Sequence, residues 1–543
     1  MIEFRFPLPS CNIDGRHNGI YNNEEMGYPC MLTTLDSRLG QMIDRLRLSI
    51  IDDRRLVFID GRVLMCSKNW IRDHVHEMKG FCHWEYDMTS FLNYILDTQR
   101  DDGCYYELIK QLDDYHWQYV NEDCRIIFPG DNLALVRLEI EADIEYLVVE
   151  GAMDCYRVTG DIDWLKKYLP RLEKGIEYIT SSPKRWDEAH GLVKRALTID
   201  TWDFAYREPG TNRRISDGMP MGIMHGDNSG VYQAMNQLAY FNRLLGNTEK
   251  AVEWKKRAEQ IRTAMFRYLW NGKFFIHTLY LGDGIDDKES ERLSLSNTYD
   301  MNRGVTNAEQ SRSIIEEYMA RRKTTQAFAE WFSIDPPYEP SFLMGNGQSY
   351  APGKYVNGAI SPFTAGELAL AAFNNGYEAY GWDIIKRFEE MTERDGTIFF
   401  LYSPHDGTRQ GGGPSAWGAA ALLNAIDCGL AGIVNTGVSY DSIAFSPRFP
   451  VTEYDELRYI TGYELTHTTV DVRYIRTDRG MRYQIKSPAR TVNAHILLPH
   501  GKQATAVKID ENDCGFTVSQ IGDSVYADFS VTAAPCLNIE VLF

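Results

Sequence analysis

The sequence predicts a mainly α-helical fold, in which helical hairpins form a toroid and a small β-sandwich follows at the C-terminal end. Two observations lead to it. In the middle of the chain, apolar helices repeatedly end in Gly and an amphipathic helix follows. From about residue 436 onward, short segments alternate apolar and polar residues with a period of two, which is typical of strands.

The helical hairpins are clearest at three turns, at Gly160, Gly246 and Gly376, each followed by a Trp a few residues later. Glycine adopts the left-handed conformation that ends a helix, so the next helix folds back. A hairpin cannot bury its apolar face alone, so hairpins of roughly 43 residues must stack as a solenoid or close as a toroid. Long loops rich in Trp, Asp, His and Gly favour the toroid, because such loops in a compact domain usually carry function.

The change in hydrophobic pattern along the sequence also predicts domain boundaries. The three predicted units are an N-terminal β-containing segment at 1–65, a helical catalytic domain at 66–435 and a β-sandwich at 436–543. The strand pattern of the last unit is clearest at 468–475, 482–485 and 537–541.

Composition excludes several classes of function. The 543 residues carry a net charge of −19, and no basic run offers a surface for nucleic acid. No apolar run approaches the ~20 residues of a membrane span. The ten cysteines form no C-x-x-C pair, which argues against a structural zinc site. We expect neither a metal nor a cofactor. The first residues lack the features of a signal peptide, and we expect a cytoplasmic protein.

Five polar and aromatic segments lie before or at the start of predicted inner helices. In a toroid these helix starts share one end, so the segments are expected to surround one site. They are Asn69–His74, Ile199–Phe204, Met224–Asn228, Tyr355–Glu367 and Gly411–Trp417.

Asp203 is the predicted catalytic acid. Glycoside hydrolysis needs a protonated carboxyl group beside the leaving oxygen. Trp202 and Phe204 flank Asp203 and are suited to form an apolar wall that raises its pKa. The alternative is an Asp that caps a helix or turn.

These segments resemble those of known glycosidases. Thr201–Phe204 (TWDF) is similar to the acid-bearing segment of trehalases, and Asn69–His74 (NWIRDH) resembles the Trp-x-Arg-Asp segment of glucoamylases. The resemblance implies the (α/α)₆ barrel of the six-hairpin glycosidase superfamily. It also implies Asp203 as the acid, with Arg72 and Asp73 gripping a terminal sugar. The C-terminal tail resembles that of disaccharide phosphorylases and rhamnosidases.

The general base is where the sequence departs from these families. The position expected to hold Glu falls near Phe400. Glu367 is the best candidate in another loop, and the alternative for it is a first-turn Glu favoured by the helix dipole. Glu330 and Asp335 are weaker candidates. A phosphorylase would need no base, and Arg409 with the Gly-rich segment after it would then bind phosphate.

The remaining candidates are predicted to bind the substrate. The short polar side chains among them suit sugar hydroxyls, although His225 and Asp227 lie in a segment that also suits a helix-capping turn. The Trp side chains suit stacking on a sugar ring, although a buried Trp is more common. They are Trp70, Trp202, His225, Asp227, Asn357 and Trp417.

We therefore expect an inverting, exo-acting glycoside hydrolase that cleaves a terminal sugar from an oligosaccharide or glycoside. The alternatives are an inverting disaccharide phosphorylase and a non-catalytic helical-repeat or carbohydrate-binding protein. Neither nucleic acid nor membrane is expected as a partner.

Overall fold

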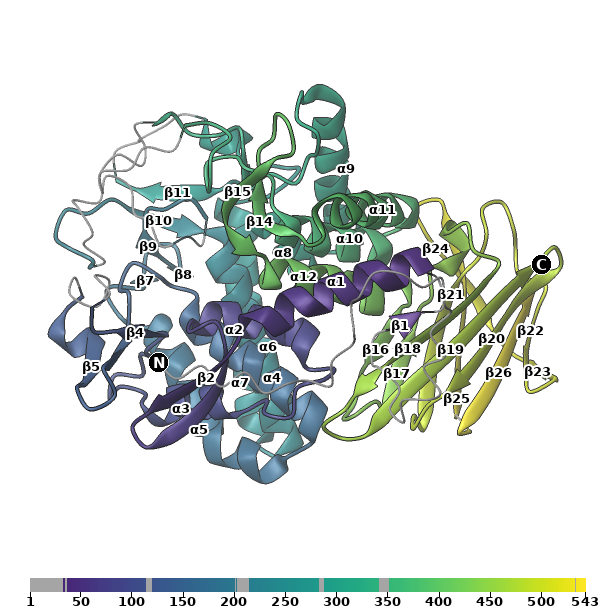
Figure 1. The fold of residues 1–543 in the computed structure, drawn as a ribbon, viewed down its shortest axis with the longest axis horizontal. Helices are drawn as coiled ribbons and strands as arrows, with labels where there is room; N and C mark the ends of the chain where they lie inside the picture. The colour runs from purple at the N-terminus through teal and green to yellow at the C-terminus, as the bar shows by residue number, and fades with distance from the viewer. Residues whose placement is uncertain are drawn as a thin grey trace.

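The computed structural model describes residues 33–34, 37–113, 120–200, 202, 214–282, 288–340, 351–532 and 534–543. Figure 1 shows a helical part and, at its side, a part built of β-sheets that carries the C-terminus. Within the described ranges, none of the helices combines the length and apolar character needed to cross a bilayer. The mainly α-helical prediction with a C-terminal β region is confirmed at this level.

The described residues form twelve α-helices. They are α1 (Ser37–Asp53), α2 (Ile71–Phe81), α3 (Ser90–Asp97), α4 (Ile144–Thr159), α5 (Ile162–Ile179), α6 (His225–Leu244), α7 (Thr248–Tyr268), α8 (Ser296–Asn302), α9 (Ala308–Thr324), α10 (Pro362–Asn374), α11 (Glu378–Asp395) and α12 (Ala416–Asn424). The predicted hairpin turns are confirmed at Gly160, Gly246 and Gly376. Each has a positive φ and joins two consecutive helices.

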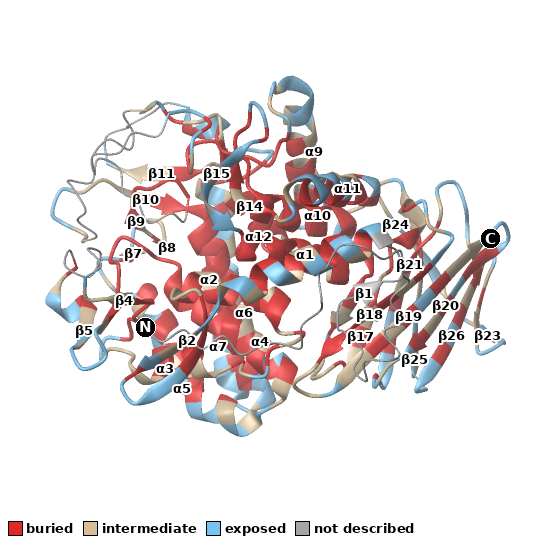
Figure 2. Ribbon diagram, viewed as in Figure 1, coloured by how far each residue is buried: buried red, intermediate tan, exposed pale blue. Residues whose placement is uncertain are grey.

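The even-numbered helices contact one another in chain order. Helix α2 packs against α4, α4 against α6, α6 against α8, α8 against α10, α10 against α12, and α12 against α2. Figure 2 shows that buried residues concentrate on these helices, whereas much of α9 is exposed. The odd-numbered helices therefore lie outside an inner set whose members contact in a cycle.

Glycine allows the inner helices to approach closely. A Cβ at Gly230 of α6 would lie 2.3 Å from the Tyr146 ring of α4. A Cβ at Gly366 of α10 would lie 2.6 Å from the Ala421 backbone of α12. Side chains at these positions would push neighbouring helices apart, so these glycines contribute to the tight inner packing.

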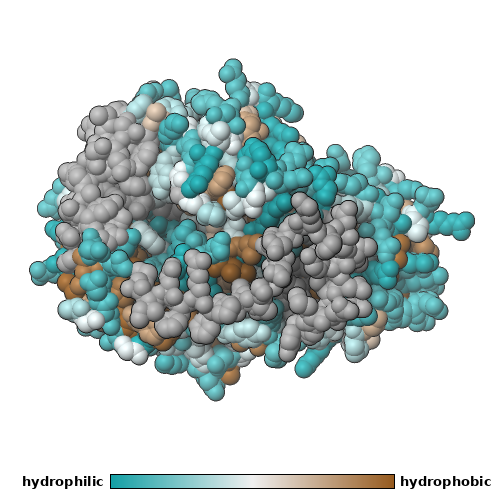
Figure 3. All heavy atoms as spheres, in the orientation of Figure 1, coloured by the Kyte–Doolittle hydropathy of each residue, from teal (hydrophilic) through white to brown (hydrophobic). Residues whose placement is uncertain are grey.

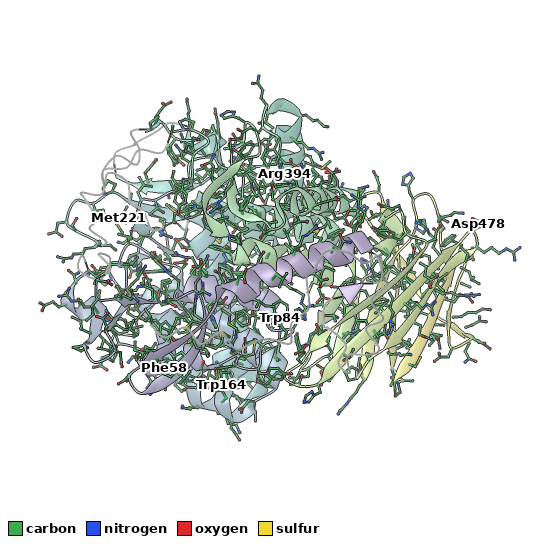
Figure 4. The ribbon with its side chains drawn as sticks, viewed as in Figure 1. Phe58, Trp84, Trp164, Met221, Arg394 and Asp478 are labelled. Carbon is green, nitrogen blue, oxygen red and sulfur yellow. The ribbon has the colours of Figure 1, made fainter. Side chains whose placement is uncertain are left out.

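Two sheets form the C-terminal part. The first has the order β1-β18-β19-β20-β26-β22-β23 and the second the order β16-β17-β21-β25-β24. Phe445 of β17 and Tyr483 of β20 meet edge to face at 5.5 Å, so the two sheets pack against each other. The predicted strands at 468–475, 482–485 and 537–541 are confirmed within β19, β20 and β26. Asp478, in the turn between β19 and β20, lies at the end of the sheets away from the helices (Figure 4).

The strands of these two sheets are β1 (Thr33–Thr34), β16 (Ile433–Asn435), β17 (Ser442–Phe445), β18 (Glu456–Tyr463), β19 (Thr468–Thr477), β20 (Gly480–Lys486), β21 (Thr491–Leu497), β22 (Ala506–Ile509), β23 (Asn512–Cys514), β24 (Thr517–Ile521), β25 (Ser524–Thr532) and β26 (Cys536–Leu542). Figure 3 shows that the visible surface of these C-terminal sheets, at the right of the view, is mainly hydrophilic.

The helical part also contains short strands. They are β2 (Arg54–Ile59), β3 (Arg62–Ser67), β4 (Leu108–Gln111), β5 (Arg125–Phe128), β6 (Leu133–Val136), β7 (Trp186–Asp187), β8 (Leu192–Val193), β9 (Arg195–Ala196), β10 (Met221–Met224), β11 (Thr278–Leu281), β12 (Leu293–Ser294), β13 (Ile334–Asp335), β14 (Phe399–Tyr402) and β15 (Arg409–Pro414). Many of them belong to the connections that precede inner helices.

The predicted unit 1–65 contains several different elements in its described part. Strand β1 pairs with β18 of the C-terminal sheet. Helix α1 packs against α2, α11 and α12, and β2 forms a hairpin with β3. The two boundaries between the three predicted units stay predictions.

Candidate functional site

A cavity of about 150 Å³ lies where the starts of four inner helices converge. Its wall combines aromatic side chains with three charged groups. The lining residues are Lys68, Trp70, Arg72, Asp73, Trp202, Leu295, Tyr355, Phe363, Phe400 and Trp417. The structure thus brings together five of the predicted site residues, from segments up to 347 residues apart (70 to 417) in the sequence.

Local sequence explains how these helix starts are fixed. Helix α10 begins with Pro362 after Ser361, whose hydroxyl accepts a hydrogen bond from a backbone N–H of the first turn. Ser415 caps α12 in the same way, accepting from the N–H of Gly418 at 3.0 Å. The caps hold Phe363 and Trp417, each the second residue of its helix, at the cavity wall.

Arg72 is held by carboxylates behind the wall. Its Nε and Nη2 donate to the two carboxylate oxygens of Asp143 at 2.5 and 2.8 Å, and Nη2 also donates to Glu141. Arg72 and both carboxylates are buried. Such bidentate pairing fixes the guanidinium rigidly and offsets its charge.

Asp73 is the one carboxylate on this wall among the described residues. Burial raises the pKa of Asp73, and the ammonium group of Lys68, 3.7 Å away, lowers it in part. A carboxylate whose pKa moves towards neutrality is suited to proton transfer.

The aromatic residues of the wall are not equivalent. Trp417 stacks on Phe363 at 4.6 Å and on His76 at 4.3 Å, so protein neighbours already use its ring surface. Its Nε1 donates to the hydroxyl of Tyr299. The Nε1 of Trp202 is buried and has no hydrogen-bond partner in the part of the chain that the structure describes. A buried donor of this kind at a cavity is suited to bind a ligand oxygen.

Three non-glycine residues at or near the cavity have a strained backbone. Lys68 and Tyr355 line the cavity, and Asp200 lies two residues before Trp202; all three have positive φ, at 46°, 46° and 52°. Non-glycine residues in this region cost about 1–3 kcal/mol each and cluster at functional sites.

Buried contacts hold the segment that leads to the predicted acid. Ser296 at the start of α8 donates to the Asp200 carboxylate from Oγ at 2.5 Å and from its backbone N–H at 3.2 Å. Arg195, fully buried, donates from Nη2 to the carbonyl of Trp202 at 2.9 Å. Asp203 itself lies outside the described residues, so its role as the acid stays a prediction.

Two predicted binding residues at the start of α6 do not line the cavity. His225 is buried, with Nδ1 2.5 Å from Asp300 and Nε2 2.7 Å from Ser294. Asp227 is buried 3.4 Å from Arg195 Nη1, and burial raises its pKa to about 6. Both side chains point to neighbouring elements, because the first turn of α6 packs inside the helical part.

Asn357 and Glu367 are also away from the cavity wall. Asn357 bonds the backbone of Tyr338 in both directions, at 2.7 and 2.8 Å. Glu367 accepts from Lys79 Nζ at 2.8 Å and from Asn302 Nδ2 at 2.6 Å. Within the inner helices, Lys79 thus offsets the charge of Glu367 and Asn302 occupies its second carboxylate oxygen.

The weaker sequence candidates are likewise not part of this wall. Glu330 is fully buried and binds Arg387 and the hydroxyl of Tyr380. Asp335 pairs with Arg321. Arg409 lies in β15, 5.0 Å above the Phe399 ring.

Five residues of the wall were not predicted, namely Lys68, Leu295, Tyr355, Phe363 and Phe400. Tyr355 and Phe363 belong to a segment singled out from the sequence, and Lys68 immediately precedes another. Phe400 lies near the position where the resemblance to glycosidases led us to expect the Glu that acts as general base. Leu295 carries no local signal, because an apolar residue before a helix is commonplace.

The sequence model of the trehalase family matches residues 200–334, a stretch that includes Trp202 and Asp203. No curated protein matches the chain.

Solved structures resemble the chain over 70–94% of its length. The α-L-rhamnosidase of Dictyoglumus thermophilum matches 94% of this chain and 50% of its own, with a TM-score of 0.58 and 13% identity. That of Streptomyces avermitilis, complexed with L-rhamnose, matches 94% and 42%, with a TM-score of 0.57 and 12% identity. A GH63 mannosylglycerate hydrolase from Thermus thermophilus matches 70% and 99%, with a TM-score of 0.51 and 15% identity.

At these identities the likeness describes the fold. The chain spans half or less of the length of the rhamnosidases that it matches.

Proposed function

Because the chain has the fold of the six-hairpin glycosidases, we propose that it is an exo-acting glycoside hydrolase that inverts the configuration of its sugar. The observation that carries this proposal is the cavity, which joins Arg72, Asp73 and three Trp side chains from distant loops. Apolar ring surfaces beside a few polar groups suit a sugar. Its substrate would be an oligosaccharide or a glycoside.

The proposed architecture is a closed (α/α)₆ barrel. The cyclic contacts among α2, α4, α6, α8, α10 and α12 support it. In this arrangement α1 supplies the outer partner of α12, against which it packs. One end of the barrel then carries the cavity.

The cavity volume supports the exo mode. About 150 Å³ is below the volumes of about 300–1,000 Å³ that are usual for drug-sized ligands. A single terminal sugar suits this space better than an internal stretch of a polysaccharide.

In the proposed mechanism, Asp203 protonates the leaving oxygen and a second carboxylate activates water on the opposite sugar face. Glu367 is the base that the sequence predicts. Asp73 is better supported by geometry, because it lies on the cavity wall, whereas Lys79 and Asn302 hold Glu367 away from it. In either case the two carboxyl groups of an inverting enzyme lie about 6.5–9.5 Å apart.

The test is hydrolysis of aryl glycosides and disaccharides by the wild type and by Asp203→Asn. General acid catalysis typically contributes about 10²–10⁴-fold, so turnover should fall by that factor on substrates with poor leaving groups. The loss should shrink on nitrophenyl glycosides, whose leaving groups need little protonation. Equal loss on all substrates would argue against the acid role of Asp203.

A disaccharide phosphorylase is the second candidate. It is favoured by Phe400 on the wall near the position expected for a base, and by Lys68, a cation on the same wall. The same screen in phosphate and in a phosphate-free buffer distinguishes the two enzymes, because only the phosphorylase requires phosphate. Binding of sugars without turnover in either buffer would favour a non-catalytic carbohydrate-binding protein.

A further inference from the structure

A second cavity, of about 340 Å³, lies beside the end of α5 and shares no lining residue with the sugar cavity. Four cationic side chains line it. The lining residues are Arg100, Asp102, Cys104, Cys124, Arg137, Glu139, Tyr178, Ser182, Pro183, Lys184 and Arg185. Four separate stretches of the chain thus form one polar chamber.

Arg185 is a buried cation of this cavity whose hydrogen-bonding groups are only partly satisfied by the protein. It is 1% exposed, and its Nη2 donates to the backbone carbonyl of Glu139. Its Nε and Nη1 are buried without a hydrogen-bond partner. No ion pair joins it to a carboxylate in the described part of the chain.

The other cations of the cavity differ, because each has an acidic partner. Lys184 pairs with Glu139, Arg100 with Asp102 and Asp123, and Arg137 with Glu107 and Glu145. Burial raises the pKa of both Cys104 and Cys124 to about 12, so the thiols are neutral and do not balance Arg185. Arg185 is thus the one cation of this wall without an ion pair in the described part of the chain; its charge acts at longer range on the carboxyl group of Asp227, which pairs with Arg195.

A buried charge without a partner costs several kcal/mol, and N–H groups left unpaired add to that cost. An anion that accepts hydrogen bonds removes both penalties at once. Phosphate suits the site, because guanidinium groups bind it through charge-assisted hydrogen bonds. Lys184, which pairs with Glu139, lies on the same wall as a second donor.

We propose that this cavity binds the phosphate group of a small molecule, or inorganic phosphate, with Arg185 as the principal ligand. The volume admits a phosphorylated sugar as well as the free ion. The site is separate from the sugar cavity, since no residue lines both.

Binding is measured directly, because activity is not a clean readout. Arg137 of this cavity donates to the backbone carbonyl of Glu141, whose carboxylate binds Arg72 of the sugar cavity. Isothermal titration and thermal unfolding of the full chain with inorganic phosphate, glucose 6-phosphate and, at matched ionic strength, chloride provide the measurement. At about 100-fold excess over Kd, phosphate should raise Tm by about 2 °C, and chloride should not.

Arg185→Gln should abolish the rise in Tm, while its own Tm in chloride should equal or exceed that of the wild type, because an unmatched buried charge is gone. Arg482→Gln is the control. It removes an exposed arginine, paired with Glu540, from the C-terminal sheet, and it should keep the full rise. Lys184→Gln, which changes a half-exposed side chain, should weaken binding about tenfold.

Tighter binding of glucose 6-phosphate than of inorganic phosphate would assign the site to a phosphorylated metabolite, and the reverse would assign it to the free ion. Three results would overturn the proposal. They are no shift with either phosphate, an equal shift with chloride, and a shift that survives in Arg185→Gln or, should that variant not fold, one that is not reduced in Lys184→Gln.

Discussion

Asp73 and Glu367 both carry a carboxylate, but their neighbouring side chains give them different surroundings. Glu367 is 2% exposed and meets both Lys79 and Asn302, so its charge is already used inside the helical part. Asp73 borders the cavity, and burial raises its pKa. At the scale of single residues, access to the cavity rather than residue type decides which carboxylate suits catalysis.

This contrast yields a prediction on the base. Asp73→Asn should lower hydrolysis by about 10²–10⁴-fold, because neutral water attacks an oxocarbenium-like centre poorly without a base. Azide needs no deprotonation, so it should partly restore turnover of nitrophenyl glycosides in Asp73→Asn. The measurement is the release of nitrophenol with and without azide.

Glu367→Gln is the matched control. It should lose stability, because Lys79 is left as a buried charge with a weaker partner, but it should show no rescue by azide. Rescue of Glu367→Gln together with an azide-insensitive Asp73→Asn would restore Glu367 as the base. Asp73 would then hold the sugar, as the resemblance to glucoamylases implies.

Helix-to-helix contacts depend on residues with no side chain. Gly366 lets α10 lie against the backbone of α12, where a Cβ would come within 2.6 Å of the Ala421 carbonyl carbon. Both helices begin at the sugar cavity. The close approach of the α10 and α12 backbones therefore helps to position the cavity wall.

Gly366→Ala should destabilise the protein by about 1–3 kcal/mol, because an added methyl group against backbone cannot be relieved by a rotamer change. Urea unfolding measures this loss. Gly130→Ala is the control, since its Cβ would meet no atom within 4 Å and its φ is not positive. Equal stability of the two variants would contradict the tight packing of α10 and α12.

A buried acid joins the end of the helical part to the C-terminal sheets. Asp427 follows α12 in a π-helical turn (Ala425–Leu430), and burial raises its pKa to about 7. His83 lies 3.9 Å away, and burial lowers its pKa to about 4. Between about pH 4 and 7 both groups are therefore mainly uncharged at this junction.

The raised pKa of Asp427 predicts a pH dependence of stability. The unfolded chain loses this proton near pH 4, whereas the folded chain keeps it up to about pH 7. The contribution of Asp427 to stability thus falls as the pH rises from 4 to 7. Asp427→Asn should be more stable than the wild type at pH 8, by at most about 4 kcal/mol, and similar to it at pH 4.5. Urea unfolding at both pH values checks this, and a difference of the same size at both would refute it.

The two parts of the molecule share one continuous apolar core. Polar contacts reinforce it, because Glu378 at the start of α11 accepts hydrogen bonds from Ser524 and Tyr526 of β25. Arg448 is buried and donates to the carbonyl of Phe373 at 3.2 Å. Helices and sheets are therefore expected to unfold together.

Truncation tests this view of the whole molecule. A chain that ends at residue 435 should be insoluble or should lack a cooperative transition, because the faces of α10 and α11 that meet the sheets would be exposed. Circular dichroism during thermal unfolding measures the transition. A soluble fragment with a sharp transition and the helical content of the full chain would show instead that the sheets are dispensable.

The sequence by itself determined the elements that have local signals. A glycine after an apolar helix marks a hairpin turn whatever surrounds it, and the turns at Gly160, Gly246 and Gly376 were predictable for that reason. Period-two alternation likewise predicted the strands of the C-terminal sheets. The shared end of the inner helices led to the prediction of one site, and Arg72 and Trp417, from two of the predicted segments, both line the cavity.

Only the tertiary structure decided which polar residues face the cavity and which are used inside the protein. Glu367 is paired with Lys79, 288 residues away in the sequence, and no local pattern reports that contact. The same holds for Arg185, whose unmatched charge becomes visible only when the carboxylates around it are assigned to other cations. Local periodicity is set by neighbours along the chain, but the charge and accessibility of a site are set by neighbours in space.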